Sequence, residues 1–364
     1  MTIALKIVIF FLVVYSKKKK IIMITSFLRL LVLLLLVTSA NQSVKAETIN
    51  VEPGTDTIQA AMDAASNGDI LQLAAGTYKG YVNFNGKALT LQGLGKTSVI
   101  KGDGNIATVI FDNDEGADSV IDQVYLTRGH RAGAILINSA SPTIKRSWFI
   151  RNRAIGAGSA IYFFGRDSNG DSATVTNCVF THNRTLSAQL GNIAHTLHLD
   201  DSDPTITNNT IIYNDRAGIN ISGNSNPVIR NNLLGYNGRI KSKGKKKRGR
   251  GILVSFADGI AGGDIQYNLF YKNKRADFGF GTSVRVKPYT DVDAIAALNG
   301  FGSFALANNL EGDPLLVKRK KAKDITLRAG SLAIDAGDPD SAFNDVDASA
   351  NDIGATGGPS PIEI

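Results

Sequence analysis

A nine-residue hydrophobic pattern recurs six times in the central part of the chain. Each copy has an apolar residue at its first and sixth positions, and usually asparagine at its ninth. The copies are IDQVYLTRG, IKRSWFIRN, VTNCVFTHN, ITNNTIIYN, IRNNLLGYN and IQYNLFYKN, beginning at residues 121, 144, 175, 206, 229 and 265. Their spacings of 23, 31, 31, 23 and 36 residues indicate a 23-residue unit with loop insertions. Repetition at this period is typical of a solenoid.

A second segment in each unit alternates between apolar and polar residues. These segments are AILIN, AIYFF, TLHLD, GINIS and GILVS, at 134–138, 160–164, 196–200, 218–222 and 251–255. Strict alternation predicts a strand with one face in the core. Turns such as SASP, DDSDP and GNSNP separate the strands, which gives three strands per coil. We therefore predict an all-β fold in which successive coils stack as parallel strands about 4.7–4.9 Å apart.

Two positions of the nine-residue pattern are rich in asparagine. Asparagine tolerates the left-handed backbone conformation and can bond its own turn, so a stacked column of asparagines can satisfy backbone groups from coil to coil. We expect a structural role for both columns. Cys178 shares the fourth position and is interpreted as a small buried filler. The columns are Val124, Ser147, Cys178, Asn209, Asn232 and Asn268 at the fourth position, and Gly129, Asn152, Asn183, Asn214, Asn237 and Asn273 at the ninth.

An open stack of strands needs caps, because its end strands expose unpaired edges. The segment TIQAAMDAASNGDILQLAAGTYKG (57–80) predicts a short amphipathic helix and a strand, so residues 47–80 are assigned to an N-terminal cap. The coils occupy 81–310, and a C-terminal coil and cap occupy 311–364. A single cysteine allows no internal disulfide, so core burial must hold this domain together.

Residues 1–46 are interpreted as a leader, because they contain no acidic residue and have a lysine run before an apolar core from Leu30 to Val37. Small residues precede Glu47, which is typical of a secretory signal peptide cleaved after Ala46. The apolar core is far shorter than the roughly 20 residues of a membrane-spanning helix. We expect a secreted or periplasmic monomer with no stable membrane anchor. Residues 1–22 are interpreted as an extension of the gene model, with Met23 as the true start.

The charge of the chain is segregated. The leader holds seven of the 40 basic residues, which leaves 33 basic against 32 acidic residues. RIKSKGKKKRGR (239–250) contributes eight of these basic residues, and KRKKAK (318–323) five. The first run, with Lys245 and Arg248, is either a solvated loop or a surface that attracts an acidic polysaccharide. A nucleic-acid partner is disfavoured by export and by the lack of an aromatic platform within the run.

The stretch HTLHLDDSDP (195–204) holds two of the four histidines and three aspartates. With its leucines in the core, His198 and Asp200 point outward on one face of a strand. This gives a mixture of aromatic, imidazole, carboxylate and amide groups, which is typical of a sugar-binding face. Neighbouring coils and the margins of the face add Tyr162, Phe164, Arg166, Asp201, Arg216 and Asn220.

A family resemblance rests on the opening IQAAMDAASNGDILQLAAGTYKG, the six coils and the ending GDPLL to NDVDASANDIGATGG (312–358). Together they resemble the exported bacterial right-handed parallel β-helix proteins of the pectin-lyase-like superfamily. The resemblance covers nearly all of the chain after the leader, and implies a substrate on an outward strand face. The superfamily includes polysaccharide lyases, glycoside hydrolases, epimerases and adhesins, so the fold does not supply the activity.

Two enzyme chemistries fit the candidate face. A glycoside hydrolase needs two carboxylates roughly 5–10 Å apart, which Asp200 could form with Asp201 or another nearby aspartate. A lyase needs a base that removes the proton beside a uronate carboxylate, for which Arg166 and Arg216 are candidates. The Asn-Thr-Asp and Gly-His-Gly motifs of polygalacturonases are absent, and no pectate-lyase motif surrounds the arginines. The sequence therefore leaves the reaction open.

No metal site is expected at the two histidines of this stretch. Residues three apart lie on opposite faces of a strand, so His195 could join His198 only from the preceding turn, and no cysteine completes a ligand set. DVDASAND (345–352) places oxygen-bearing side chains at alternate positions but lacks the glycine and glutamate of an EF-hand. We interpret it as turn bonding within a terminal cap, with calcium as the alternative.

The sequence as a whole predicts an exported β-helix protein that binds a polysaccharide. If the protein is an enzyme, we expect it to degrade that polysaccharide. The alternative is a non-catalytic adhesive or matrix module. The hypothesis assigns catalysis to His198, Asp200, Asp201 and Arg216, and substrate binding to Tyr162, Phe164, Arg166, Asn220, Lys245 and Arg248.

Overall fold

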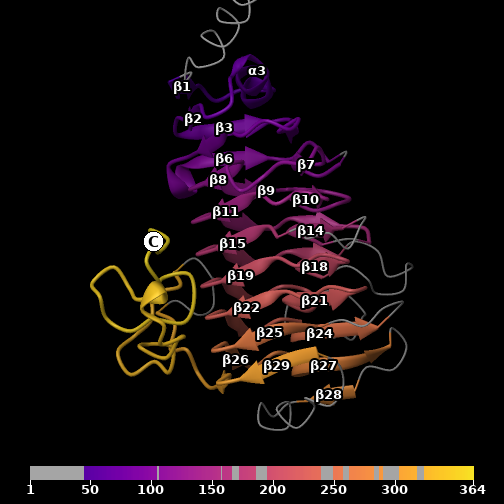
Figure 1. Cartoon of the computed structure of the whole chain (residues 1–364), viewed down its shortest axis with the longest axis vertical. Coiled ribbons are helices and arrows are strands. Elements are labelled where there is room, and N and C mark those ends of the chain that lie inside the picture. Colours follow the sequence, from indigo (N-terminus) through magenta and orange to yellow (C-terminus); the bar gives the residue numbers. More distant parts are fainter. Residues whose placement is uncertain are drawn as a thin grey trace, which may run out of the picture. The chain divides into compact units, whose positions relative to one another are not determined.

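The predicted coils form three stacked parallel β-sheets in a computed structural model of the chain (Figure 1). The structure describes residues 45–364 except 105, 157, 166–171, 186–194, 239–248, 257–261, 283–286, 290–302 and 318–323. Each coil contributes one strand to each sheet in turn, and such parallel crossovers are right-handed. The fold is thus a right-handed parallel β-helix, which confirms the prediction.

The three sheets are named A, B and C in the order in which a coil visits them. Sheet A contains β1 (Thr48–Val51), β2 (Ile70–Leu73), β5 (Thr90–Gln92), β8 (Val120–Asp122), β11 (Thr143–Lys145), β15 (Thr174–Thr176), β19 (Thr205–Thr207), β22 (Val228–Arg230), β25 (Gly262–Gln266) and β29 (Ser303–Ala307). Sheet B contains β3 (Gly76–Lys79), β6 (Ser98–Lys101), β9 (Tyr125–Thr127), β12 (Trp148–Ile150), β16 (Val179–Thr181), β20 (Thr210–Ile212), β23 (Leu233–Gly235), β26 (Leu269–Tyr271) and β30 (Leu310–Glu311). Sheet C contains β4 (Val82–Asn83), β7 (Val109–Phe111), β10 (Ile135–Asn138), β14 (Ile161–Phe164), β18 (Leu197–Asp200), β21 (Ile219–Ser222), β24 (Arg250–Phe256), β27 (Ala276–Thr282) and the antiparallel β28 (Lys287–Tyr289).

Shorter elements lie outside the three sheets. They are helix α3 (Thr57–Ala64), the 3-10 turns η1 (Gly95–Thr97) and η2 (Ser341–Phe343), and the strand pair β13 (Arg153–Ala154) and β17 (Arg184–Thr185). Helix α3 buries Ile58 and Met62 in the same core cluster as Leu71 and Leu73 of the first complete coil. Among the residues that the structure describes, no helix is long and apolar enough to cross a bilayer.

The core fills the interior of the stack, and it is built from the inward residues of the alternating pattern. All ten inward residues predicted for sheet C are at most 1% exposed. Phe149 and Phe180 occupy the sixth position of the repeat in adjacent coils, and their rings stack with centroids 4.6 Å apart. The ten residues are Ile135, Ile137, Ile161, Phe163, Leu197, Leu199, Ile219, Ile221, Ile252 and Val254.

Two buried asparagine ladders run along the stack, one at each end of sheet B. In the ninth-position ladder, each side-chain oxygen accepts a hydrogen bond from the backbone N–H of the asparagine one coil earlier. For example, the Asn183 N–H donates to the Asn214 side-chain oxygen at 3.0 Å. The Asn214 amide nitrogen donates to the carbonyl oxygens of Phe180 and Ile212, at 3.0 and 3.2 Å. The fourth-position ladder begins at the Cys178 N–H and adds Asn309, which the nine-residue pattern did not include. Cys178 is buried and unpaired with another cysteine, and burial raises the pKa of its thiol.

The C-terminal segment packs along the outer face of sheet B, against β12, β16, β20, β23 and β26. A second apolar cluster joins the two parts, because the outward residues of sheet B are themselves apolar there and need cover. The segment that the sequence assigned to a C-terminal cap thus lies, in its described residues, against one side of the stack (Figure 1). The cluster consists of Trp148, Val179, Ile212, Leu233, Leu269, Leu316, Ile325, Ala333, Ile353, Ala355 and Ile362.

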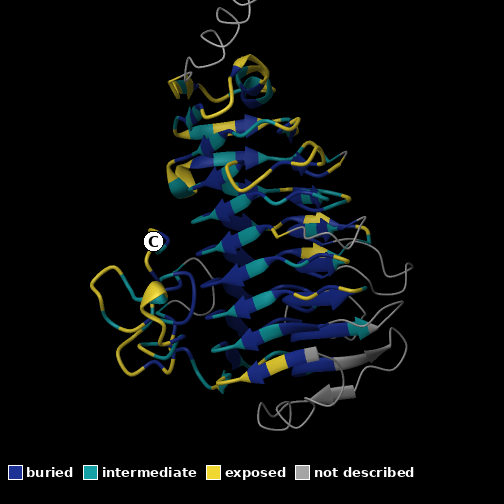
Figure 2. Cartoon of the chain, viewed as in Figure 1, coloured by how far each residue is buried: buried dark blue, intermediate teal, exposed yellow. Residues whose placement is uncertain are grey.

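Hydrogen bonds fix this C-terminal cover to the turn between sheets A and B. The Asn177 amide donates to the Gly357 carbonyl at 2.6 Å, and the Asn208 amide donates to the Asn351 side-chain oxygen at 2.8 Å. Figure 2 shows buried residues along the strands of the stack and many exposed residues in the C-terminal segment.

Substitution of a ladder asparagine should destabilise the protein far more than the same substitution in a turn. Asn214→Ala leaves buried backbone groups of adjacent coils without partners, so we expect the free energy of unfolding to fall by roughly 3 kcal/mol. Asn224→Ala, at an exposed turn position, is the matched control and should change it by less than about 0.5 kcal/mol. Denaturant unfolding measures both, and equal effects would contradict a stabilising role for the ladder.

Asp277 should make stability depend on pH at the C-terminal end of the ninth-position ladder. Its carboxyl accepts the Asn273 amide at 2.8 Å, and burial, followed by the charge of Glu311, raises its pKa to about 6. Since the folded pKa lies above the ordinary 3.8, the protonated form stabilises the fold below about pH 4, and this contribution is lost as the pH rises to about 6.

Asp277→Asn keeps an acceptor and removes the titration. The unfolding free energy of the variant relative to wild type should therefore rise by about 2 kcal/mol between pH 4 and pH 7. A constant difference across this range would show that Asp277 ionises as readily in the folded protein as in the unfolded chain.

Candidate functional site

The outward residues of β14, β18 and β21 lie side by side on sheet C. The strand register places Tyr162 opposite His198, which is in turn opposite Asn220. In the next outward row, Phe164 lies opposite Asp200, and Asp200 opposite Ser222. The alternating pattern and the repeat thus bring together residues from three coils. This set of six residues is called the sheet C face below.

A hydrogen-bond network joins these rows. The Tyr162 hydroxyl donates to an Asp200 carboxylate oxygen at 3.1 Å, and the Ser222 hydroxyl donates to the Leu199 carbonyl at 2.7 Å. His198 Nε2 lies 3.1 Å from that same hydroxyl. The Tyr162 ring centroid lies 5.8 Å from that of Phe164 and 5.3 Å from that of His198.

The sheet C face divides into an accessible part and a buried part. Tyr162, Phe164 and Asp200 are half-buried. His198 and Asn220, by contrast, are only 3% and 1% exposed, although both point away from the core. The sequence predicted that all five lie on an open surface. Strand alternation predicts the direction of a side chain but not whether another segment buries it. A ligand at this face therefore meets the two aromatic rings and the carboxylate.

His195 lies two residues before β18 and approaches His198 from the preceding turn. Their ring centroids are 6.0 Å apart in an edge-to-face arrangement. Burial holds the pKa of His195 well below its ordinary value, and the charges of His198 and Arg216 act in the same direction. The imidazole is therefore neutral at neutral pH. In the described part of the chain, no group of three or more histidine, cysteine, aspartate or glutamate residues could hold a metal ion.

The remaining predicted site residues lie at the margins of the face or beyond what the structure describes. Asp201 has left-handed backbone geometry, with φ of 53°, and its carboxylate accepts the Asn224 N–H at 2.8 Å. This carboxylate thus stabilises a turn between coils. Arg216 is half-buried, and its charge contributes to the low pKa of His195. Arg166, Lys245 and Arg248 lie outside the described residues.

Side-chain oxygens of the DVDASAND segment accept hydrogen bonds from nearby N–H groups. Asp347 accepts the Ser349 N–H at 3.0 Å and the Ser349 hydroxyl at 2.6 Å. Asp345 accepts the Asp352 N–H at 3.2 Å. These are the turn bonds that the sequence favours for this segment.

The chemistry of the sheet C face is that of hydrogen bonding next to aromatic surface. Burial, together with the neighbouring Asp200 charge, raises the pKa of Tyr162, so its hydroxyl stays protonated and acts as a donor. Asp200 supplies acceptor oxygens, and Phe164 adds apolar area beside them. Sugars present both hydroxyl groups and C–H faces, which such a combination of polar atoms and rings can bind.

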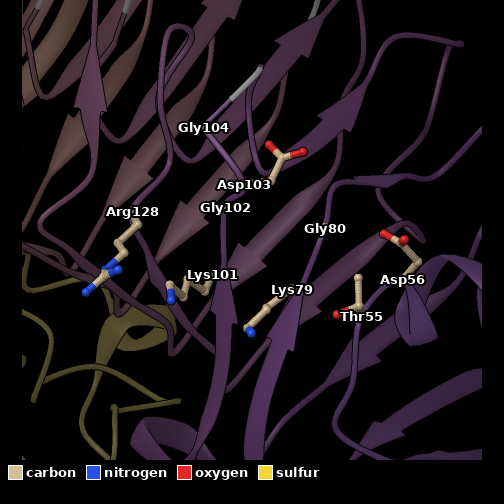
Figure 3. A pocket seen from close by; sticks show the side chains of 9 residues that line it. All are labelled: Thr55, Asp56, Lys79, Gly80, Lys101, Gly102, Asp103, Gly104 and Arg128. Atoms are coloured by element: carbon tan, nitrogen blue, oxygen red, sulfur yellow. The ribbon is translucent and has the colours of Figure 1, made fainter.

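Sequence analysis missed a row of basic residues outside the turn between sheets B and C. Arg128, Arg151 and Arg153 line a pocket of about 630 Å³ with Tyr125, Thr127 and His130. Lys79, Lys101 and Arg128 line an adjoining pocket of about 560 Å³ (Figure 3). The signal was present in the repeat: Arg128 and Arg151 are eighth-position residues, and Arg153 and Arg184 are tenth-position residues.

Comparison with known proteins supports the fold described above. The model of the right handed beta helix region matches residues 107–286. The chain is a right-handed β-helix protein. No curated protein sequence matches it significantly.

Two solved structures are similar to this β-helix protein. Pectate lyase Pel9A superposes with a TM-score of 0.54 at 14% identity, covering 86% of this chain and 97% of that chain. The PL6 family polysaccharide lyase Pedsa3628 from Pseudopedobacter saltans has a TM-score of 0.23 at 12% identity, covering 79% and 98% of the two chains. The first likeness shows the pectate-lyase-like fold alone, and the second is too low to add to it.

Proposed function

We propose that this β-helix protein is exported and binds a polysaccharide on the sheet C face. The observation that carries the proposal is the half-buried Tyr162–Asp200 hydrogen bond next to the Phe164 ring, spanning two adjacent coils. The donor hydroxyl and the acceptor carboxylate match sugar hydroxyl groups, and the rings match sugar C–H faces. The leader that the sequence predicts supports export.

The network behind the face supports binding because it holds the accessible groups in place. The Ser222 hydroxyl donates to the Leu199 carbonyl at 2.7 Å, and its oxygen lies 3.3 Å from an Asp200 carboxylate oxygen and 3.1 Å from His198 Nε2. Groups held by a buried network lose little conformational freedom when a ligand binds. Similarity to the fold of a pectate lyase favours a polysaccharide over other ligands.

Two substitutions test this face. Tyr162→Phe removes the hydroxyl donor, and Asp200→Asn removes the charge of the acceptor, so each should weaken polysaccharide binding by about fivefold to tenfold. A glycan array first identifies the ligand, and calorimetry then measures the affinity of each variant. The controls are Tyr81→Phe and Asp118→Asn, which make the same changes at exposed positions elsewhere. Wild-type affinity in both test variants, or no ligand on the array, would refute the proposal.

Cleavage is tested separately on the ligand that the array identifies. New reducing ends would indicate hydrolysis, and absorbance from an unsaturated uronate would indicate a lyase. If either appears, Asp200→Asn should abolish it, and unchanged turnover would exclude this face from the mechanism. Binding without either product would identify a non-catalytic surface or matrix module.

A further inference from the structure

We propose that the protein has a second binding site, for an anionic polysaccharide chain that lies along the stack axis. The site is the groove formed by the two adjoining pockets outside the turn between sheets B and C, here called the basic groove. It goes beyond the sheet C face and uses none of its residues. Its principal residues are Lys101, Tyr125, Arg128, His130, Arg151 and Arg153.

The coil geometry places one cation after another along the groove. Lys79 is in register with Lys101, and Lys101 with Thr127, which directly precedes Arg128. Thr127 is in register with Ile150, which directly precedes Arg151. Four successive coils therefore each contribute a cation, with adjacent strands about 4.7–4.9 Å apart. Figure 3 shows Lys79, Lys101 and Arg128 in a row, with Asp56 and Asp103 set away from it.

The backbone fixes where the two arginines of this row point. Arg128 and Arg151 both have φ of 58°, in the left-handed region that side chains other than asparagine and glycine seldom adopt. His182, Tyr213 and Tyr236 have the same geometry at the eighth position of later coils. The turn thus imposes this conformation on these successive coils, whereas the residue type at this position varies. Arginine at this position in two successive coils is not required by the fold.

Basic residues outnumber acidic ones along the groove, where Asp56 and Asp103 line the smaller pocket only. The salt bridges found among the described residues involve Lys145, Arg146 and Arg230, and none of the groove cations. The larger pocket, of about 630 Å³, is lined by three arginines and no acidic residue. Burial lowers the pKa of His182 in the next coil, and the charges of Arg151 and Arg184 lower it further. The positive potential therefore extends beyond the pocket.

The polar groups of the larger pocket suit a sugar polymer. His130 lines the pocket, and its buried Nδ1 has no hydrogen-bond partner among the described residues. Tyr125 adds a half-buried aromatic ring. Guanidinium groups bind carboxylates and sulfates with two parallel hydrogen bonds. An acidic polysaccharide carries carboxylates or sulfates at regular intervals. The groove likewise carries its cations at the regular spacing of the coils.

The test uses a short oligogalacturonate as the probe and a neutral malto-oligosaccharide of the same length as its control. Arg151→Gln with Arg153→Gln removes two cations of the larger pocket. We expect about a tenfold loss of oligogalacturonate affinity by calorimetry, and a weaker dependence of the remaining affinity on salt. Arg151→Lys with Arg153→Lys keeps the charge but not the paired hydrogen bonds, and should lose less.

Lys272→Gln with Lys274→Gln is the matched control. These lysines occupy the eighth and tenth positions of a distant coil, so the variant has the same charge change at equivalent sites. It should bind as wild type does, as should the sheet C variant Asp200→Asn, which separates this proposal from the proposed function. Equal unfolding midpoints will show that all the variants are folded.

Three outcomes would overturn the proposal. One is unchanged oligogalacturonate affinity in the Arg151 and Arg153 variant, and another is an equal loss in the lysine control. The third is that a short duplex DNA binds as tightly as the oligogalacturonate and displaces it, which would assign the groove to nucleic acid.

Discussion

Hydrogen bonds between equivalent turns of successive coils underlie the whole β-helix. Strands of neighbouring coils pair in register, and at the ends of sheet B the chain must turn without leaving buried N–H and carbonyl groups unpaired. The two asparagine ladders solve this problem, because each side-chain amide both accepts from one backbone group and donates to others. A one-residue slip would move every inward side chain to the outside. The ladders therefore fix the register as well as satisfy the turns.

A fixed interior leaves the outer faces free to differ. The outer face of sheet B is apolar over its later coils and is covered by the C-terminal segment, whereas that of sheet C carries polar and aromatic groups. The left-handed turn between sheets B and C differs again, with exposed arginines in early coils and half-buried or buried tyrosines in later ones. Tyr213 and Tyr236 stack with their ring centroids 4.6 Å apart. One coil geometry thus supports an apolar cover, the proposed sugar-binding face and the basic groove.

The proposed sites differ in how their groups are held. On the sheet C face, a carboxylate, a hydroxyl and an imidazole are linked in one network, which favours recognition of particular hydroxyl groups. In the basic groove, exposed arginines follow the coil spacing, which favours recognition of regularly spaced charge. A polymer bound to the sheet C face would cross neighbouring coils, and a polymer bound in the basic groove would do the same. The two surfaces could therefore hold separate chains or separate segments of one chain.

The coil, its three strands and its inward residues follow from the sequence, because alternation and the repeat are local properties of the chain. The sequence also indicates that Tyr162, His198 and Asn220 share one face, since register follows from the spacing of the repeats. Which outward residues are accessible depends instead on how the folded chain packs. His198 and Asn220 are buried, and Trp148 of sheet B is covered by a segment almost 200 residues later in the sequence. Strand periodicity gives the direction of a side chain, but its exposure depends on distant segments that no local pattern encodes.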